Sequence, residues 1–167
     1  HYKIVFGVIL GSGCGGGLVV DRKIISGINN LSGEWGHNPL PYYGINEDKN
    51  ILQNTLVPNL SIEKFISGKG LESLYFENFK KRLSTKEIFS KKEENSKFIK
   101  DFFNRVARSL SLLINTVDPD AIVFGGGVSN EIENLDLLRD MTGNFAGKKS
   151  IKTCLLYTSP SPRDLVI

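Results

Sequence analysis

The chain has 167 residues, a mass of 18.5 kDa and a formal net charge of +3 at pH 7, which suits one domain with a single core. Its basic residues are interleaved with acids, and no apolar run approaches the roughly 18 residues of a membrane span, so neither nucleic acid nor membrane is an expected partner. With two cysteines and no visible signal peptide, we expect a cytoplasmic protein without a disulfide framework.

The first predicted element is a buried strand over residues 4–10, an apolar run of ordinary strand length. A glycine-rich segment follows, and a second apolar run over residues 18–20 predicts the next strand. Glycine lets backbone N–H groups approach a ligand closely, and a tight turn can direct several of them at one anion. The segment is not a P-loop, because no Lys-Ser/Thr follows and the next element is a strand. A glycine-rich turn without a ligand is an equally weighted alternative at this point. The segment consists of Gly11, Ser12, Gly13, Cys14, Gly15, Gly16 and Gly17.

A third short strand is predicted at residues 24–25. Residues 27–41 are rich in glycine, asparagine and proline and are predicted to be a loop, and residues 42–59 show no clear period. A short helix is predicted over residues 61–68, capped by its first serine and ended by its glycine.

The longest predicted helix covers residues 96–116, because its apolar residues recur every three or four positions and Pro119 follows its end. A capping-box pattern at residues 84–87 predicts another, shorter helix before it. The apolar stripe of the long helix consists of Phe98, Phe102, Val106, Leu110, Leu113 and Val117.

Residues 121–124 predict a short buried strand, followed by a tight loop of three glycines. Ser129 or Asn130 is expected to cap a last helix, and Glu133 three residues after Asn130 supports this start. A strand, a glycine loop and a helix N-terminus together favour an anion, because the first N–H groups of the helix are free. The three glycines are Gly125, Gly126 and Gly127.

Four segments, in this order, resemble the ROK family of sugar kinases and repressors, above all its bacterial fructokinase and N-acetylglucosamine kinase branch. They are residues 9–20, 32–41, 61–70 and 117–130, and the second contains the pattern Gly-Glu-Trp-Gly-His. The resemblance implies an α/β fold of the ribonuclease-H-like, actin/hexokinase-like ATPase type, in which ATP lies between two lobes. Residues 1–153 would form most of the C-terminal lobe of a kinase truncated at both ends.

The resemblance also implies a nucleotide site. Both glycine segments, residues 11–17 and 125–127, would contact ATP, the first as a hairpin loop on the phosphates, and Mg²⁺ would accompany the nucleotide. Backbone N–H donors suit phosphoryl transfer because this reaction needs positioning and charge neutralisation from the protein. The family's general base, an aspartate, would lie upstream of this chain, so no catalytic residue is expected here.

Three side chains are implied as sugar contacts: Glu34, His37 and Glu63. Carboxylate oxygens accept hydrogen bonds from sugar hydroxyls, and two oxygens can hold a diol. Without the resemblance, both glutamates would be interpreted as carboxylates facing solvent. For His37, a loop histidine bonded to the backbone is a nearly equal alternative.

In the family this histidine also binds a structural zinc together with three cysteines. The corresponding positions here are Asn54, Leu56 and Ser61. Zinc needs about four nitrogen, sulfur or oxygen ligands, so His37 alone cannot hold it. We therefore expect no metal site and no structural zinc.

Residues 154–167 differ in composition from the preceding chain, match no element of the family and resemble a translated sequencing adapter. We expect them to be a non-native tail that packs poorly.

The activity implied for the intact parent protein is transfer of the γ-phosphate of Mg-ATP to a hexose hydroxyl, with fructose first and N-acetylglucosamine second. The fragment itself is expected to be inactive because it lacks the base. A sugar-responsive ROK repressor is the rival, less favoured because residues 11–13 and 15–17 of the phosphate loop are both intact. A non-catalytic relic is the third interpretation. Hexose and ATP are the expected partners, and a homodimer of the parent is kept as an option.

Overall fold

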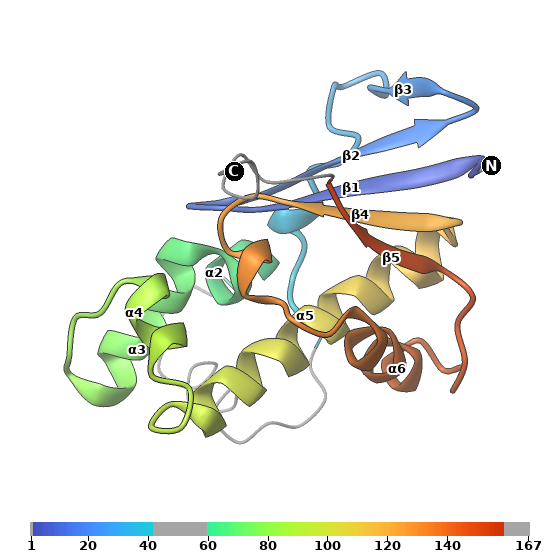
Figure 1. The fold of residues 1–167 in the computed structure, drawn as a ribbon. Helices are drawn as coiled ribbons and strands as arrows, with labels where there is room; N and C mark the ends of the chain where they lie inside the picture. The colour runs from blue at the N-terminus through green and yellow to red at the C-terminus, as the bar shows by residue number, and fades with distance from the viewer. Residues whose placement is uncertain (1, 42–59, 159–167) are drawn as a thin grey trace, which may run out of the picture.

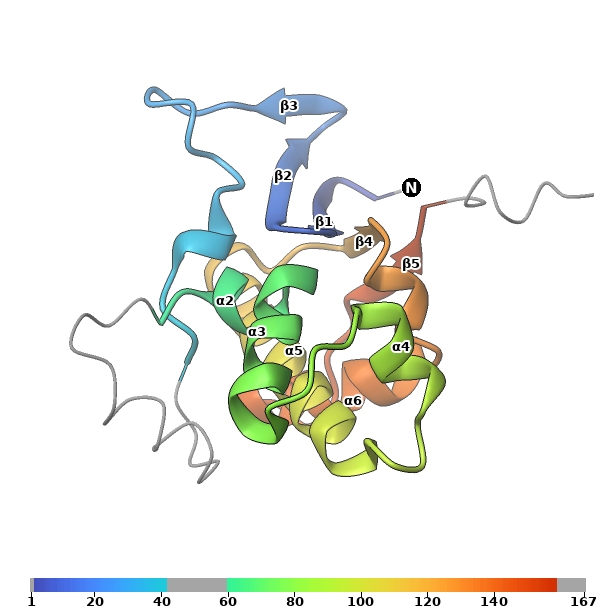
Figure 2. The same cartoon turned by 90° about the vertical axis from the view of Figure 1, so that its left-hand side faces the viewer.

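The computed structural model describes residues 2–41 and 60–158 and shows a five-stranded mixed sheet with helices packed against one of its faces (Figure 1, and in a second view Figure 2). The strand order is β3-β2-β1-β4-β5, with β1 antiparallel to β2 and parallel to β4. The strands are β1 (Ile4–Leu10), β2 (Cys14–Val20), β3 (Lys23–Ile25), β4 (Ala121–Gly125) and β5 (Cys154–Tyr157).

The β1–β2 hairpin is longer than its sequence predicted. β2 begins at Cys14, which pairs with Leu10, so only residues 11–13 form the hairpin turn. The expected loop over residues 11–17 is therefore wrong in its second half, where the glycines lie within the strand. Glycine is unfavourable in strands by propensity, but here the pairing with β1 outweighs that preference.

The helices come in two groups, before and after β4. The first group is η1 (Trp35–His37), α2 (Ile62–Ile66), α3 (Gly68–Phe79), α4 (Thr85–Ser90) and α5 (Ser96–Val117). The second group is η2 (Ser129–Glu131) and α6 (Leu135–Phe145). Within the described part of the chain, no helix is long and apolar enough to cross a membrane.

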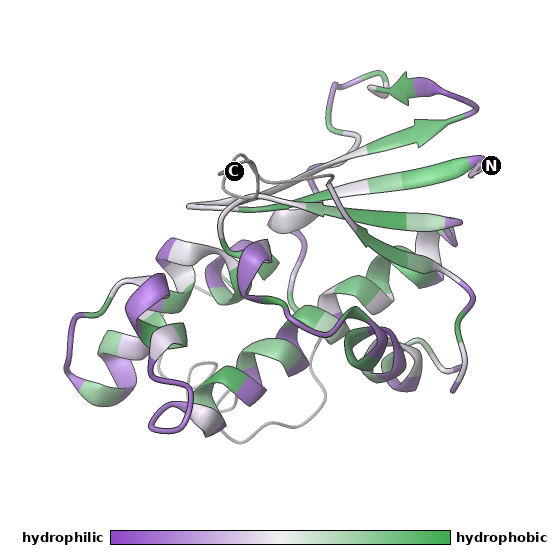
Figure 3. Cartoon of the chain, viewed as in Figure 1, coloured by the Kyte–Doolittle hydropathy of each residue, from purple (hydrophilic) through white to green (hydrophobic). Residues whose placement is uncertain are grey.

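The predicted long helix is confirmed as α5, which begins at Ser96 as expected and ends one residue later than predicted. Its apolar stripe is buried except at Val117, which is half-buried. In Figure 3, β4 and β5 carry mostly hydrophobic colour, and hydrophobic and hydrophilic colours alternate along α5. The helix ends where Asp118 adopts a left-handed conformation with φ of 46°.

Two helix predictions were wrong. The segment predicted as one helix over residues 61–68 contains α2, which ends at Ile66. A second helix, α3, starts at Gly68, where the prediction places the helix end. The last helix starts at Leu135 with Asn134 as its cap, whose side chain accepts from the N–H of Leu137. Ser129 instead belongs to the short turn η2, where its hydroxyl donates to the carbonyl of Gly125.

The first residues of the expected tail are packed. Cys154–Tyr157 form the edge strand β5, Leu155 is 8% exposed, and the hydroxyl of Tyr157 donates to the carbonyl of Ile132. The backbone of these four residues pairs with β4, while the side chains of Leu156 and Tyr157 stay 36% and 44% exposed. The expectation of a non-native tail stays a prediction. Residues 159–167 of the expected tail lie outside the described residues.

Candidate functional site

The start of α3 forms backbone hydrogen bonds with the hairpin turn at residues 11–13. The N–H of Gly68 donates to the carbonyl of Gly11 over 2.7 Å, and the N–H of Lys69 reaches the carbonyl of Ser12 over 3.4 Å. Inside the turn, the N–H of Gly11 donates to the carbonyl of Gly13 over 3.0 Å. The N–H groups of Ser12 and Gly13 have no backbone acceptor among the described residues. Backbone donors without such an acceptor are the kind of group that can bind an anion.

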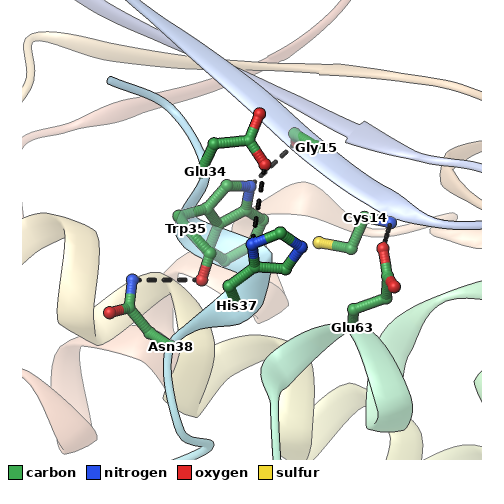
Figure 4. A network of polar contacts seen from close by, with 7 residues as sticks. All are labelled: Cys14, Gly15, Glu34, Trp35, His37, Asn38 and Glu63. Atoms are coloured by element: carbon green, nitrogen blue, oxygen red, sulfur yellow. Dashed lines mark hydrogen bonds and ion pairs between the residues drawn. The ribbon is translucent and has the colours of Figure 1, made fainter. Parts of the chain in front are cut away.

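Glu63 closes the other side of the turn. Its Oε2 accepts a 2.8 Å hydrogen bond from the N–H of Cys14 (Figure 4). The same oxygen lies 2.8 Å from where a Cβ on Gly13 would be, so the carboxylate lies directly against this peptide. Burial, and then the charge of Glu63, raise the pKa of the Cys14 thiol to about 12.

The loop at residues 33–37, which carries two of the expected sugar contacts, packs against β2 through Trp35. The indole is 3% exposed, and its Nε1 donates to the carbonyl of Gly15 over 2.8 Å. Its ring meets that of Phe6 edge to face, with centroids 6.2 Å apart. The side chain between Glu34 and His37 is therefore a core residue that fixes the loop.

Three glycines allow this loop and β2 to approach so closely. A Cβ on Gly33 would lie 2.5 Å from the carbonyl oxygen of Gly16, and one on Gly36 would lie 2.3 Å from that of Cys14. A Cβ on Gly16 would lie 2.7 Å from the ring of Phe6. The structure thus gives Gly16 a packing role, although its sequence context suggested a phosphate contact.

Glu34 and His37 lie together at the surface of this loop. Their Oε2 and Nδ1 atoms are 3.8 Å apart, and their side chains are 49% and 71% exposed. Figure 4 shows both side chains on the same side of β2 as Glu63. A β-bridge between Pro39 and Ser61 ties the chain after His37 to the residue that precedes α2. All three expected sugar contacts are therefore brought to one region.

The distal glycine loop, residues 125–127, lies beside the hairpin turn. Gly126 has φ of 91°, and a Cβ there would lie 2.5 Å from the carbonyl oxygen of Leu10, the last residue of β1. That carbonyl accepts from the N–H of Val128 over 2.8 Å. The side chain of Val128 in turn lies 3.4 Å from where a Cβ on Gly68 would be. The hairpin turn, the start of α3 and the distal glycine loop therefore converge.

The segment between α2 and α3 is part of this convergence, and sequence reasoning missed its role. Ser67 caps α3 by accepting from the N–H of Gly70. A Cβ on Gly70 would lie 2.1 Å from the carbonyl oxygen of Lys64, so only glycine fits. The available signal was Ser67 itself, because serine is a preferred N-cap residue. The sequence prediction instead ended a helix at Gly68.

The described residues contain no group of three or more His, Cys, Asp or Glu side chains that could hold a metal ion. Of the three positions where the family has zinc-binding cysteines, Ser61 is described and lies in the bridge with Pro39. Asn54 and Leu56 lie outside the described residues. The expected absence of zinc stays a prediction.

Residues 1–164 match the ROK family. An N-acetyl-D-glucosamine kinase from Histophilus somni is 38% identical over 138 residues, covering 78% of this chain and 45% of that relative. Another from Yersinia enterocolitica is 33% identical over 142 residues, with the same two coverages. The chain thus spans about half the length of the curated relatives it matches.

Solved structures share the fold. A ROK hexokinase from Thermus thermophilus has a TM-score of 0.71 at 18% identity and covers 97% of this chain and 54% of its own. A ROK family glucokinase from Streptomyces griseus in complex with glucose and AMPPNP has a TM-score of 0.66 at 21% identity, with coverages of 93% and 55%. A ROK family transcriptional regulator has a TM-score of 0.68 at 16% identity, with coverages of 93% and 41%. The expected fold class is confirmed.

Proposed function

The chain belongs to the ROK family, and from this membership we propose that it is the part of an ATP-dependent sugar kinase that binds the phosphates and one side of the sugar. The transferred group would be the γ-phosphate of ATP and the acceptor a hexose hydroxyl. Residues 1–153 would belong to the C-terminal lobe of the longer protein, and the general base would be supplied from outside this chain.

The observation that carries this proposal is the hydrogen bond between Glu63 and the N–H of Cys14. It joins a carboxylate implied in sugar binding to a turn implied in phosphate binding. Phosphoryl transfer requires the acceptor hydroxyl and the γ-phosphate to be held close together and in line. A sugar-binding carboxylate in direct contact with the phosphate-binding turn would meet that requirement.

On the nucleotide side, we assign the phosphates to the N–H groups of Ser12 and Gly13. The distal glycine loop at residues 125–127 would lie along the nucleotide. We assign Gly16 to the close packing of the 33–37 loop instead of to phosphate contact. Mg²⁺ commonly binds through substrate phosphates together with one or two carboxylates, so it would enter with ATP.

On the sugar side, Glu34, His37 and Glu63 would accept or donate hydrogen bonds to hydroxyls. The curated relatives reported above are named N-acetyl-D-glucosamine kinases, which favours N-acetylglucosamine as the first candidate. Fructose, the first choice from the sequence, becomes the second. A neutral acylamino sugar and a ketohexose differ at the hydroxyls nearest the carbonyl carbon, so a substrate panel separates them.

A sugar-sensing repressor is the second candidate, because a ROK family transcriptional regulator shares this fold. The two free N–H groups of the hairpin turn favour the kinase, since a repressor needs no phosphate site. We further propose a cytoplasmic location, no nucleic-acid partner and, for the longer protein, a homodimer.

The test is a coupled ATPase assay on the longer protein with Mg²⁺ and a panel of N-acetylglucosamine, fructose, glucose and N-acetylmannosamine. We expect turnover with N-acetylglucosamine above all, and a raised KM for the sugar in Glu34→Gln. The 167-residue chain alone should show no turnover, because a missing general base removes about 10²–10⁴-fold of the rate. Binding of operator DNA with no turnover on any hexose would establish the repressor instead.

A further inference from the structure

The carboxylate of Glu63 accepts a backbone hydrogen bond from the hairpin, which a sugar contact alone does not require. Its Oε2 is already occupied, at 2.8 Å, by the backbone N–H of Cys14. That bond leaves Oε1 for a sugar hydroxyl. One side chain is therefore shared between the sugar side and the turn on the phosphate side of the site.

The helix that carries Glu63 is rigidly held. Ile62 and Ile66 are 0% exposed and Phe65 is 2% exposed, so α2 is packed into the core on both sides of the glutamate. The next residues continue into α3, whose Gly68 N–H donates to the carbonyl of Gly11. The segment from α2 to α3 therefore forms hydrogen bonds with both ends of the turn.

These hydrogen bonds determine which backbone N–H groups of the turn have no acceptor among the described residues. Because Cys14 donates to Glu63 and Gly11 donates to Gly13, the remaining N–H groups of the turn are those of Ser12 and Gly13. Loss of the Glu63 bond would free the Cys14 N–H and let the turn change its conformation. A preorganised donor set is what makes such a turn effective toward a phosphate.

We propose that Glu63 is a positioning residue for the hairpin turn as well as a sugar contact, so that sugar and nucleotide binding are coupled through one carboxylate. This inference rests on the proposed function. Glu34 is the natural comparison, because it is also an expected sugar contact but its carboxylate pairs with His37. Among the described residues, its side chain makes no hydrogen bond to the turn. The two glutamates should therefore differ in their effect on the nucleotide.

The first test needs no enzymatic activity and uses amide hydrogen exchange of the 167-residue chain. In Glu63→Ala, the Cys14 amide should exchange on the order of tenfold faster, since a hydrogen bond to a charged acceptor is lost. In Glu63→Gln, the amide oxygen can still accept, so exchange should stay close to that of the wild type. Glu34→Ala should leave the Cys14 amide unchanged. Equal exchange at Cys14 in all four proteins would overturn the proposal.

The second test measures binding of AMPPNP and of N-acetylglucosamine separately, by calorimetry on the longer protein. Glu63→Ala should weaken both ligands, the nucleotide by about fivefold or more, which is the lower range of measured couplings. Glu63→Gln should restore nucleotide affinity, and Glu34→Ala should weaken the sugar alone. An unchanged nucleotide affinity in Glu63→Ala would show that Glu63 is a sugar contact only and would overturn the proposal.

The two tests also separate this inference from the proposed function. If the longer protein turned over no hexose, the kinase assignment would fail in the wild type itself. The exchange rate of the Cys14 amide would still decide whether Glu63 positions the turn.

Discussion

The indole Nε1 of Trp35 donates a 2.8 Å hydrogen bond to the carbonyl oxygen of Gly15. This bond joins the loop that carries Glu34 and His37 to the strand that leads away from the hairpin turn. The indole covers the neighbouring glycine, because a Cβ on Gly16 would lie 2.9 Å from its Cδ1. The packing of this pair can be tested by adding a single methyl group.

Gly16→Ala should destabilise the chain by about 1–3 kcal/mol, the usual effect of overpacking a core. Gly17→Ala is the matched control, since a Cβ there would meet nothing within 4 Å. Urea unfolding can be followed by the fluorescence of Trp35, the chain's single tryptophan. Equal midpoints for the two variants would show that the loop does not pack on Gly16 as described.

The elements that sequence predicted well are those whose signal is local. The apolar run of residues 4–10 became β1, and the regular stripe of α5 placed that helix to within one residue. The capping box at Ser84 and Glu87 is present with both of its hydrogen bonds. In each case, neighbouring residues alone determine the conformation.

The misplaced boundaries of β2 and of α2 and α3 share one cause, which is glycine used for close approach. Gly68 and Gly70 lie in the first turn of α3 because the backbones of Gly11 and Lys64 lie next to them. No local sequence pattern links these glycines to those neighbours, so the sequence does not predict the contacts. Gly16 of β2 packs against the loop that follows β3. The identity of the site residues came from the resemblance, whereas the bond between Glu63 and Cys14 is visible only in the fold.

Cys14 should make stability fall at high pH. Its thiol is buried and its pKa is raised from 9.0 to about 12, so the folded chain holds this proton more tightly than the unfolded chain. The stabilisation that comes from this proton is complete below about pH 9 and is lost as the pH rises toward 12. The unfolding free energy falls by at most about 1.4 kcal/mol per pH unit. The difference in unfolding free energy between wild type and Cys14→Ala should therefore shrink over this interval. A constant difference from pH 8 to 11 would contradict it.

Truncation tests the limits of the expected tail. A chain ending at residue 158 keeps β5 and should unfold at the same urea concentration as the full chain. A chain ending at residue 153 loses the buried Leu155, whose burial is worth roughly 1.5–3 kcal/mol, and should unfold earlier. Identical midpoints for both truncations would support the expectation that the poorly packed tail begins at Cys154.

Purified protein should contain no stoichiometric zinc. Ser61 replaces one of the family's cysteines, and a serine hydroxyl is a poor ligand for zinc beside thiolate and imidazole. Elemental analysis after dialysis should find far less than one zinc per chain, and a chelator should leave the melting temperature unchanged. About one zinc per chain would require ligands beyond the described residues.

Gly13→Val should separate folding from binding. The atom that its Cβ would meet, 2.8 Å away, is Oε2 of Glu63, the mobile end of a side chain, so the fold can adjust by moving the carboxylate. The unfolding free energy should therefore fall by no more than about 3 kcal/mol, the loss of one hydrogen bond to a charged acceptor, because no backbone atom has to move. The displaced carboxylate no longer holds the N–H of Cys14, and the valine side chain covers the turn.

In the longer protein, affinity for both AMPPNP and the hexose should fall by about tenfold or more, while the distant surface variant Lys149→Ala should match the wild type. Normal nucleotide affinity in a folded Gly13→Val protein would mean that the phosphates bind away from this turn.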